Sequence, residues 1–547
     1  MNTASTDNKP IETSAVYDLL ARAVARFPEV KAMDFLGKRT SYAELGELVD
    51  RAAAGFQRLG VTKGARVALC LPNTPYYVIC YYAILRIGGV VVNLSPLYVE
   101  KELRHFLADS GARVAVTLDV GELFNKFKPI VDDGSLDHLV VGSMLDSLDP
   151  VKKFGFWLTK RKSLAKVPTQ KGYVPFSKLV GVKTLPKPVP CDPENDLAVL
   201  QYTGGTTGIP KAAMLTHANL TANCVQVRRR LPEIAPGGGM LTLVPLFHVF
   251  AMTIALNISV LLGLEIILLP RYDKELLRKT LARTKPLFFP GVPTIYANIN
   301  EAVQKETWEL SSIRYCVSGA APLPEEIRKQ FEKNSGCQLV EGYGLSEASP
   351  VVACNDFGNV RDGSIGTPVA GTTIEIRDKD DPTKCVPQGE KGEVCVRGPQ
   401  VMKGYWNRPD ETEKVFVDGF LRTGDVGYVD EEGYIFLVDR IKDLIISGGY
   451  NVYPRMVEEV LYKHPAVLEA IVVGIPDAKR GQVPKAYVKL QEGVQVTEEE
   501  LQIFLAEHLS PVERPKRIEF RDELPKTVVG KLSRKELVAE EATKPVS

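Results

Sequence analysis

The sequence predicts an α/β protein with a large N-terminal domain of helix-covered sheets, a small β-rich subdomain and a small α+β C-terminal domain. Short apolar strand patterns alternate with helix patterns over most of the chain, which favours parallel sheets covered by helices. Past Asn359 the patterns become short alternating strands with Gly and Asp turns, and past residue 440 helices and strands mix again. A chain of 547 residues is too long for one ordinary core, so we expect several domains.

The first elements are two helices around a short strand turn. The runs "SAVYDLLARAVARF" and "SYAELGELVDRAAAGFQRLG" both have helical apolar spacing within residues 14–60. Each run opens on a serine, Ser14 or Ser41, and serine is a preferred N-cap residue. We therefore expect both serines to cap the helices that follow them.

The next elements alternate regularly. The run "ARVALCL" predicts a strand, "TPYYVICYYAILRIGG" a helix that ends at glycine, and "VVVNLSP" a second strand. "KELRHFLADSG" and "RVAVTLD" repeat this alternation. These runs predict a parallel sheet.

Residues 121–190 are less regular and richer in charge, and we expect them to leave that sheet. Alternation then resumes with "DLAVLQYT" and with a helix from His217 to about Arg230. Residues 252–269, "MTIALNISVLLGLEIILL", are the most apolar stretch. Asn257, Gly263 and Glu265 interrupt it, so it predicts a buried helix followed by a strand and no membrane span.

The last elements begin with the β-rich subdomain, in which we expect "TTIEIRD", "KGEVCVRG" and "GYIFLVDR" to form antiparallel strands. Beyond residue 440, "PRMVEEVLYKH" and "TEEELQIFLAEHL" predict helices. Strand patterns lie before, between and after these helices, in "DLIISGG", "EAIVVGIPD", "PKAYVKL" and "RIEFRDEL".

Composition narrows the function class. The chain has 68 Lys and Arg against 67 Asp and Glu, a balance that argues against a general nucleic-acid binder. Its nine cysteines are scattered and none has CxxC spacing, so we expect reduced thiols and no zinc site. The polar opening "MNTASTDNKP" lacks the apolar core of a secretory signal, and we expect a cytoplasmic protein.

The loop "YTGGTTGIPK" over residues 202–211 has the chemistry of a phosphate site. Its glycines permit a nest of backbone N–H groups around phosphate oxygens, and its threonines and lysine add hydroxyl donors and a positive charge. Walker A spacing is absent because Ile209 and Pro210 separate glycine from lysine. The residues concerned are Thr203, Gly204, Gly205, Thr206, Thr207, Gly208 and Lys211.

This loop resembles the phosphate loop of the adenylate-forming superfamily, which includes acyl-CoA synthetases, luciferases and peptide-synthetase adenylation domains. Further stretches match that superfamily in the right order along nearly the whole chain. They are "PLFHV" (245–249), "SGAAPLP" (318–324), "EGYGLSE" (341–347), "RTGD" (422–425), "DRIKDLIISGGYNVYP" (439–454) and "PKTVVGK" (525–531).

The resemblance implies a two-step reaction. A carboxylate and ATP give an acyl-adenylate and pyrophosphate, and the thiol of CoA then displaces AMP. It implies Mg²⁺ as cofactor, with Glu347 and Thr203 as its ligands, and Tyr343 over one face of adenine. The other residues that it assigns to the ATP site are Gly319, Ala320, Ala321, Gly342, Gly344 and Ser346.

Other roles also come from the resemblance. Asp425 and Arg440 would bind the ribose hydroxyls, and Lys531 would bring the attacking carboxylate and the α-phosphate together and stabilise the developing charge. His248 would stand beside the acyl pocket and the thiol tunnel. We count Lys531, Thr203, Glu347 and His248 as the catalytic candidates.

The resemblance further implies a mobile C-terminal domain over residues 443–547, a hinge at 440–442 centred on Lys442, and an N-terminal domain over 1–439 that includes the β-rich subdomain at about 360–439. Rotation about this hinge would bring Ser447, Gly448 and Gly449 to the border of the CoA tunnel, where missing side chains leave room.

The acid is less closely defined. The stretch from Phe250 to Tyr296, which contains Phe288 and Phe289, could form a long acyl tunnel or simply core. The chain looks most like bacterial long-chain fatty acid–CoA ligases, although Met252 stands where some long-chain members have a tryptophan gate. The alternatives are a medium-chain or aryl-acid ligase of the coumarate type, a fatty acyl-AMP ligase and a non-catalytic fatty-acid-binding protein.

Residues 151–162, "VKKFGFWLTKRK", combine an aromatic cluster with five cations. Basic residues beside an anionic bilayer contribute up to about 1 kcal/mol each. The segment predicts either peripheral contact with the inner face of the membrane or a solvated charged loop. A monomer and a homodimer are both compatible with the sequence.

Overall fold

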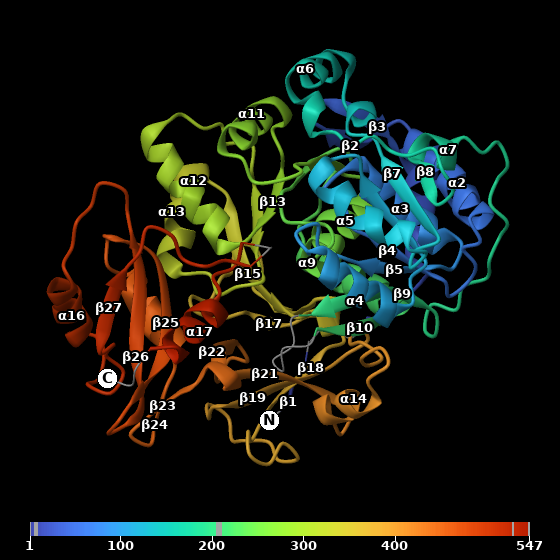
Figure 1. The fold of residues 1–547 in the computed structure, drawn as a ribbon. Coiled ribbons are helices and arrows are strands. Elements are labelled where there is room, and N and C mark those ends of the chain that lie inside the picture. The colour runs from blue at the N-terminus through green and yellow to red at the C-terminus, as the bar shows by residue number, and fades with distance from the viewer. Residues whose placement is uncertain (1, 5–8, 204–209, 528–529, 545–547) are drawn as a thin grey trace.

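The computed structural model describes residues 2–4, 9–203, 210–527 and 530–544, and within them the strands form four sheets (Figure 1). Five of the predicted phosphate-loop residues lie outside this described part of the chain, namely Gly204, Gly205, Thr206, Thr207 and Gly208. The predicted α/β class, with its β-rich subdomain and small C-terminal domain, is confirmed.

The first sheet has the strand order β10-β9-β5-β4-β6-β7-β8, and every pair except β10–β9 is parallel. Its strands are β4 (Arg66–Leu69), β5 (Val90–Asn93), β6 (Val114–Leu118), β7 (His138–Gly142), β8 (Tyr173–Pro175), β9 (Leu197–Thr203) and β10 (Lys211–Thr216). Its connections include α3 (Pro75–Arg86), α4 (Glu100–Ser110), α5 (Gly121–Asp132) and α7 (Phe176–Val180).

Our expectation that residues 121–190 leave this sheet is wrong. Strands β7 and β8 lie within that range and extend the sheet in parallel beyond β6. Residues Leu139–Gly142 of β7 are all buried. This apolar run is short and lies between charged segments, so the sequence pattern did not indicate a strand. Helix α6 (Pro150–Lys160) lies between β7 and β8 in the chain.

The second sheet has the order β17-β16-β15-β14-β13-β11-β12-β2-β3. Its strands are β2 (Lys31–Phe35), β3 (Lys38–Ser41), β11 (Gly239–Thr242), β12 (Glu265–Leu268), β13 (Phe288–Gly291), β14 (Tyr315–Ser318), β15 (Gln338–Gly344), β16 (Val351–Cys354) and β17 (Thr367–Pro368). Its helices include α8 (His217–Arg230), α11 (Lys274–Thr284), α12 (Pro293–Lys305) and α13 (Glu325–Ser335).

The apolar stretch 252–269 folds as predicted. It continues the short helix α9 (Val249–Ala251) through a π-helical segment, Met252–Asn257, into α10 (Ile258–Leu262), and Gly263 ends the helix in a left-handed conformation before β12. All of Met252–Val260 is buried. Among the described residues, no helix combines the length and the apolar character that a bilayer crossing requires.

The two predicted serine caps differ. Ser41 caps α2 (Tyr42–Arg58) in a capping box with Glu44, because its hydroxyl accepts the Glu44 amide and the Glu44 carboxylate accepts the Ser41 amide. Ser14 does not cap α1 (Val16–Arg26). The N-cap of that helix is Ala15, which makes no side-chain hydrogen bond, while the Ser14 hydroxyl donates to the Ala15 carbonyl.

The β-rich subdomain is an antiparallel sheet of order β1-β18-β19-β21-β20, with β22 paired to β21. Its strands are β18 (Thr373–Arg377), β19 (Gly392–Arg397), β20 (Phe416–Val417), β21 (Phe420–Val429) and β22 (Ile435–Arg440), and α14 (Pro409–Val415) precedes β20. The N-terminal strand β1 (Asn2–Ala4) pairs with β18, which the sequence did not predict.

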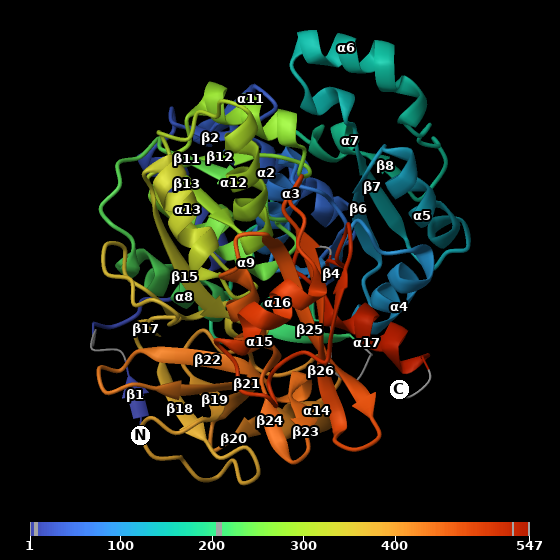
Figure 2. The same ribbon diagram turned by 90° about the vertical axis from the view of Figure 1, so that its left-hand side faces the viewer.

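The C-terminal domain has a sheet of order β24-β23-β26-β25, with β27 paired to β26. Its strands are β23 (Ile445–Ser447), β24 (Tyr450–Val452), β25 (Val467–Asp477), β26 (Gly481–Leu490) and β27 (Arg517–Phe520). Its helices are α15 (Pro454–Tyr462), α16 (Glu498–Ala506) and α17 (Arg534–Ala542). Figures 1 and 2 show this domain, in orange and red, beside the second sheet and the β-rich subdomain.

Candidate active site

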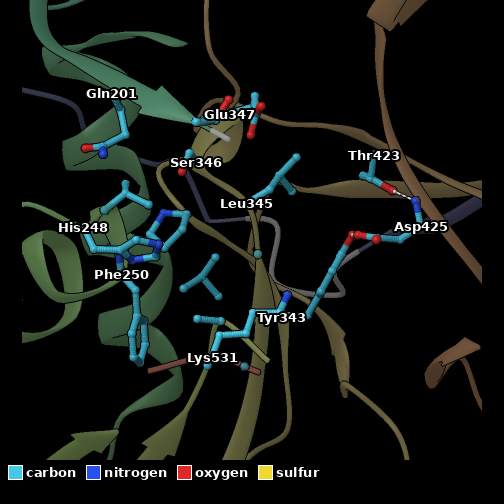
Figure 3. Close-up of a pocket in the computed structure, with 18 of the residues that line it drawn as sticks. Gln201, His248, Phe250, Tyr343, Leu345, Ser346, Glu347, Thr423, Asp425 and Lys531 are labelled. Carbon is cyan, nitrogen blue, oxygen red and sulfur yellow. Dashed lines mark hydrogen bonds between the residues drawn. The ribbon is translucent and has the colours of Figure 1, made fainter. Parts of the chain in front are cut away.

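A cavity of about 1080 Å³ opens where the large domain, the β-rich subdomain and the C-terminal domain meet. Figure 3 shows its central side chains. Strand β9 ends at it, the strand β15 and the turn after it form one wall, and β21 with β22 form another. The C-terminal domain contributes Lys531. Residues far apart in the sequence therefore share one site.

Asp425 and Arg440 lie opposite each other on the antiparallel strands β21 and β22. Arg440 donates from Nε to Oδ1 of Asp425 at 3.1 Å, and the Tyr343 hydroxyl donates to Oδ2 at 2.5 Å. The Asp425 amide donates to the Thr423 hydroxyl at 3.1 Å. Both oxygens of this carboxylate face the cavity region with fixed partners, an arrangement suited to a diol.

Glu347 lies in the turn after β15 and lines the cavity. The hydroxyl of Tyr405 donates to its Oε1 at 2.8 Å, and burial raises the pKa of the carboxyl group. No cluster of three metal-ligating side chains occurs among the described residues. A single carboxylate on a polar cavity fits Mg²⁺, which keeps several waters and takes its remaining ligands from substrate phosphates. Thr203, at the end of β9, lines the same cavity.

Lys211 lines the cavity at the start of β10, yet its ammonium group forms an ion pair with Glu411 of α14 and lies 5.3 Å from the centre of the Tyr405 ring. Its side chain is only 13% exposed. In this structure the lysine therefore connects the strand after the glycine-rich loop to the β-rich subdomain. From the sequence we expected this lysine only at the phosphates.

Lys531 enters the cavity on a loop of the C-terminal domain. The carbonyl of the neighbouring Gly530 accepts a hydrogen bond from the Thr294 hydroxyl of the large domain at 2.8 Å, and Thr527 accepts the Lys531 amide at 3.2 Å. Burial and the nearby Arg440 charge lower the pKa of Lys531 to about 8. In this domain arrangement Lys531 and Asp425 line the same cavity.

His248 lines the cavity at the N-cap of α9, where its Nδ1 accepts the Phe250 amide at 3.3 Å. Burial, with a smaller contribution from Lys531, lowers its pKa to about 4, so the imidazole is neutral at pH 7. Because the ring is neutral and its Nδ1 already accepts a hydrogen bond, His248 is suited to forming part of the cavity wall.

The glycine-rich wall follows β14 and β15. Gly319, Ala320, Gly342, Gly344 and Ser346 line the cavity, whereas Ala321 is not among its wall residues. A Cβ on Gly344 would lie 2.0 Å from the Pro350 carbonyl oxygen, so only glycine fits there. A Cβ on Gly319 would lie 3.0 Å from the Phe250 ring, which places that ring directly against the wall.

An apolar part of the same cavity continues from His248 toward the end of α8. Its wall residues come from α8, the helix after His248 and strands β14, β15 and β16: Val227, Leu231, Phe250, Ile254, Val317, Val340 and Val351. Phe288, Phe289 and Tyr296 do not line it. They lie in the core, where the Tyr296 hydroxyl donates to the Phe289 carbonyl at 2.8 Å. Met252 is buried behind the wall, with its sulfur 3.5 Å from Asn93 Nδ2.

Several wall residues were missed by the sequence analysis. Gln201 on β9 donates to the Phe247 carbonyl at 3.1 Å and accepts from Asn93 at 3.0 Å. Gln201 and Asn93 both line the cavity. A polar residue within the apolar strand pattern "DLAVLQYT" is the signal that could have found Gln201. Tyr405 had no comparable signal, because its contact with Glu347 joins residues 58 positions apart.

The predicted hinge and tunnel residues occupy different places. Lys442 lies between β22 and β23 and lines the cavity. Ser447, Gly448 and Gly449 belong to the β23–β24 hairpin and are not among the wall residues. Gly448 and Gly449 have φ of 58° and 85°, which a two-residue hairpin loop of this type requires.

Comparisons with known proteins agree over most of the chain. The family model of the AMP-binding enzymes matches residues 20–406, and that of the AMP-binding enzyme C-terminal domain matches residues 456–531. A long-chain-fatty-acid–CoA ligase of Bacillus subtilis (strain 168) is 43% identical over 548 residues, covering 97% of this chain and 95% of the relative. A feruloyl-CoA synthase of Amycolatopsis sp is 36% identical and covers 93% and 96%.

A solved structure also matches. The crystal structure of an anthranilate CoA ligase in complex with anthranoyl-AMP superposes with a TM-score of 0.86 at 26% identity, covering 97% of this chain and 98% of that chain.

Proposed function

The chain belongs to the family of AMP-binding enzymes and is an AMP-forming acid–thiol ligase, and from this premise we propose that its acid is a long-chain fatty acid. ATP and the acid give acyl-AMP and pyrophosphate, and the thiol of CoA then gives acyl-CoA and AMP. One observation carries the choice of acid: the cavity that holds Lys531 and Asp425 continues into a part lined by aliphatic and aromatic side chains.

The apolar part favours an alkyl tail because aliphatic and aromatic side chains make up most of its wall. Val317, Val340 and Ile254 offer apolar surface to the hydrocarbon tail of the acid. Burying such a tail stabilises the complex by about 0.8 kcal/mol per CH₂. The name of the Bacillus subtilis relative supports the same choice. An aryl acid is the second candidate, supported by the name of the Amycolatopsis relative.

In the adenylation step an anionic carboxylate attacks the anionic α-phosphate, so a positive charge is needed between them. We assign the ribose to Asp425 and Arg440 and the bridging cation to Lys531, whose ammonium group attracts both the acid carboxylate and the phosphate. Mg²⁺, when bound, would neutralise the triphosphate. Glu347 and Thr203 are the residues that we assign to hold it. Tyr343, fixed by its bond to Asp425, would cover the adenine.

The thioester step uses a second arrangement of the C-terminal domain. We assign the hinge to Lys442, between β22 and β23, with the N-terminal domain over 1–439 and the C-terminal domain over 443–547. Rotation there would remove Lys531 and bring the Gly448–Gly449 turn to the cavity. The turn's lack of side chains supports its assignment to the CoA tunnel, because glycine lets a ligand approach the backbone closely.

We further propose a cytoplasmic location, where ATP and CoA are supplied, with peripheral contact between residues 151–162 and the inner face of the membrane. All nine cysteines carry free thiols, as a reducing compartment requires. Fatty acids partition into bilayers, so contact with a bilayer would place the enzyme beside its substrate.

The test is ATP-dependent pyrophosphate release with acids from C4 to C18, benzoate and coumarate, each with and without CoA. Release that peaks at C12–C18 and turns over only with CoA is the expected result. A peak with aryl acids would reject the fatty acid. Turnover that stops at acyl-AMP in the presence of CoA would indicate a carrier-protein acceptor, and no release with any acid would favour a binding protein.

A further inference from the structure

Helix α6 exposes an apolar stripe to solvent. The exposed fractions are 81% for Val151, 63% for Phe154 and 56% for Leu158. Their spacing of three and four residues places them on one face of the helix. Trp157, at 44%, borders this stripe. Figures 1 and 2 show α6 at the extremity of the molecule, away from the C-terminal domain in both views.

The opposite face holds the helix to the protein. The Asp149 carboxylate caps α6 by accepting the amides of Val151 and Lys152 at 3.0 Å. Lys152 donates to the Leu36 carbonyl, and Lys153 forms an ion pair with Asp146 at 2.7 Å. Phe156 is the one residue of α6 that is partly buried, and it packs against the main core. Two of the segment's five cations therefore have structural partners.

The other three cations follow the stripe in the chain. Lys160, Arg161 and Lys162 are exposed, and no carboxylate of the described residues lies within ion-pair distance of them. The guanidinium of Arg161 lies 4.9 Å from the centre of the Trp157 ring. The outer face of α6 thus carries an apolar stripe with an indole at its border, and three positive charges without a carboxylate partner follow at the C-terminal end of the helix.

In water only one side of this helix is supported by the protein. A helix of 11 residues is marginal unless packing supports it, and Gly155 in its centre lowers helix propensity further. A surface that takes up the stripe and pairs the cations would supply that support. An anionic bilayer does both, because its acyl boundary accepts apolar side chains while its headgroups attract lysine and arginine.

We infer that α6 docks flat on an anionic lipid surface, with Val151, Phe154 and Leu158 in the acyl boundary and Lys160, Arg161 and Lys162 at the headgroups. This inference rests on the membrane contact proposed above and makes it specific. The outer face of one helix carries the contact, while Lys152 and Lys153 act as internal supports and contribute little to lipid binding.

The test is co-sedimentation of the full chain with vesicles of zwitterionic lipid and of the same lipid with anionic lipid added. We expect binding only to the anionic vesicles. Phe154→Ser with Leu158→Ser should weaken it at least tenfold for each side chain. Replacing Lys160, Arg161 and Lys162 by Gln should weaken it about fivefold for each charge, hence on the order of 10²-fold together.

Matched controls come from exposed residues elsewhere. Ile503 is 60% exposed on α16, so Ile503→Ser removes an apolar side chain without touching α6. The triple variant Lys171→Gln, Lys178→Gln and Lys183→Gln removes three exposed positive charges that lie outside α6. Both controls should bind as the wild type does. Loss of binding in the controls equal to that in the α6 variants would overturn the inference.

Trp157 gives a direct signal, because it is one of three tryptophans and the exposed one, while Trp308 is 9% exposed and Trp406 is partly buried. The emission of Trp157 should shift to the blue when the wild type meets anionic vesicles. It should not shift in the stripe variant, which carries Phe154→Ser and Leu158→Ser. If the stripe variant instead changes the mass of the protein in solution and leaves vesicle binding intact, the face is a protein interface and the lipid inference is wrong. Pyrophosphate release without vesicles should be unchanged in every α6 variant, so failure of the ligase activity is scored separately.

Discussion

The Tyr405 hydroxyl donates a hydrogen bond to Glu347 across 2.8 Å, and the Tyr405 ring lies 5.3 Å from the ammonium group of Lys211. One tyrosine therefore contacts both the cavity carboxylate and the lysine that follows the glycine-rich loop. Its backbone is held in turn, because the Tyr405 amide donates to the Thr412 hydroxyl at 2.8 Å. The orientation of Glu347 thus depends on a residue outside every motif of the sequence.

Tyr405→Phe should weaken Mg²⁺-ATP use without unfolding the protein. A hydrogen bond to a charged group contributes about 1.5–3 kcal/mol, so the KM for Mg²⁺-ATP should rise about tenfold or more while the KM for the acid stays unchanged. Steady-state pyrophosphate release at varied Mg²⁺-ATP measures this. The partly exposed Tyr272→Phe is the control. Equal changes in both KM values would mean a general structural loss.

Lys531→Ala should separate the two half-reactions. Loss of one preorganised donor costs roughly 10²–10³ in rate, and only adenylation should show it. Single-turnover formation of acyl-AMP measures the first step, and conversion of supplied acyl-AMP by CoA measures the second. Lys379→Ala, at an exposed lysine of the β-rich subdomain, should leave both steps as in the wild type. A similar loss in the second step would contradict the assignment.

The pH dependence of adenylation should report the same lysine. The pKa of Lys531 is lowered to about 8, so its ammonium form predominates below pH 8 and is lost as pH rises through that value. The kcat/KM for adenylation should therefore fall about tenfold per pH unit above pH 8. Lys531→Arg should remove this limb, because arginine stays protonated. A limb that persists in this variant would assign it to another group.

Val227→Phe should shorten the preferred acid. Val227 lies on α8 at the apolar part of the cavity and is 7% exposed, so a phenyl ring there fills space that we assign to the tail. We expect kcat/KM for C16 acids to fall at least tenfold and that for C6–C8 acids to change less than twofold, roughly the effect of several lost CH₂ contacts. A uniform loss over all chain lengths would place the tail elsewhere.

Asp34→Asn should destabilise the large domain. Asp34 is fully buried, and Arg283 reaches its carboxylate with two bonds of 2.5 and 2.8 Å. Burial pushes the pKa of Asp34 up, but the bonds from Arg283 and the Gly37 amide outweigh it and hold the pKa below its usual value. The stabilisation is therefore present above the ordinary aspartate pKa and lost as pH falls through the folded value.

We expect Asp34→Asn to lower the free energy of unfolding at pH 7 by about 1.5–3 kcal/mol, because the charge-assisted bonds to Arg283 are lost while that arginine stays partly hydrated. Urea unfolding at pH 7 and at pH 3 measures the difference, which should shrink at the lower pH. Asp380→Asn, at a carboxylate with 83% of its side chain exposed, should change the unfolding midpoint little. A difference that does not shrink at pH 3 would indicate that the ion pair is not its cause.

The α/β alternation, the antiparallel subdomain and the order of the motifs could be predicted from the amino-acid sequence, because they depend on local periodicity and on residues close together in the chain. Motifs also predicted side chains that the fold brings together, since Asp425, Glu347, Lys531 and His248 all line the cavity.

The contacts that join distant segments could not be predicted from the sequence. The Tyr405–Glu347 bond, the Lys211–Glu411 pair and the entry of Lys531 beside Asp425 depend on how separate domains pack, which local patterns do not encode. Tertiary packing also assigned Phe288 and Tyr296 to the core and Phe250 to the cavity wall, although all three belong to one apolar stretch. Hydrophobicity predicts burial, but the neighbours of a buried side chain are set only when the sheets and helices meet.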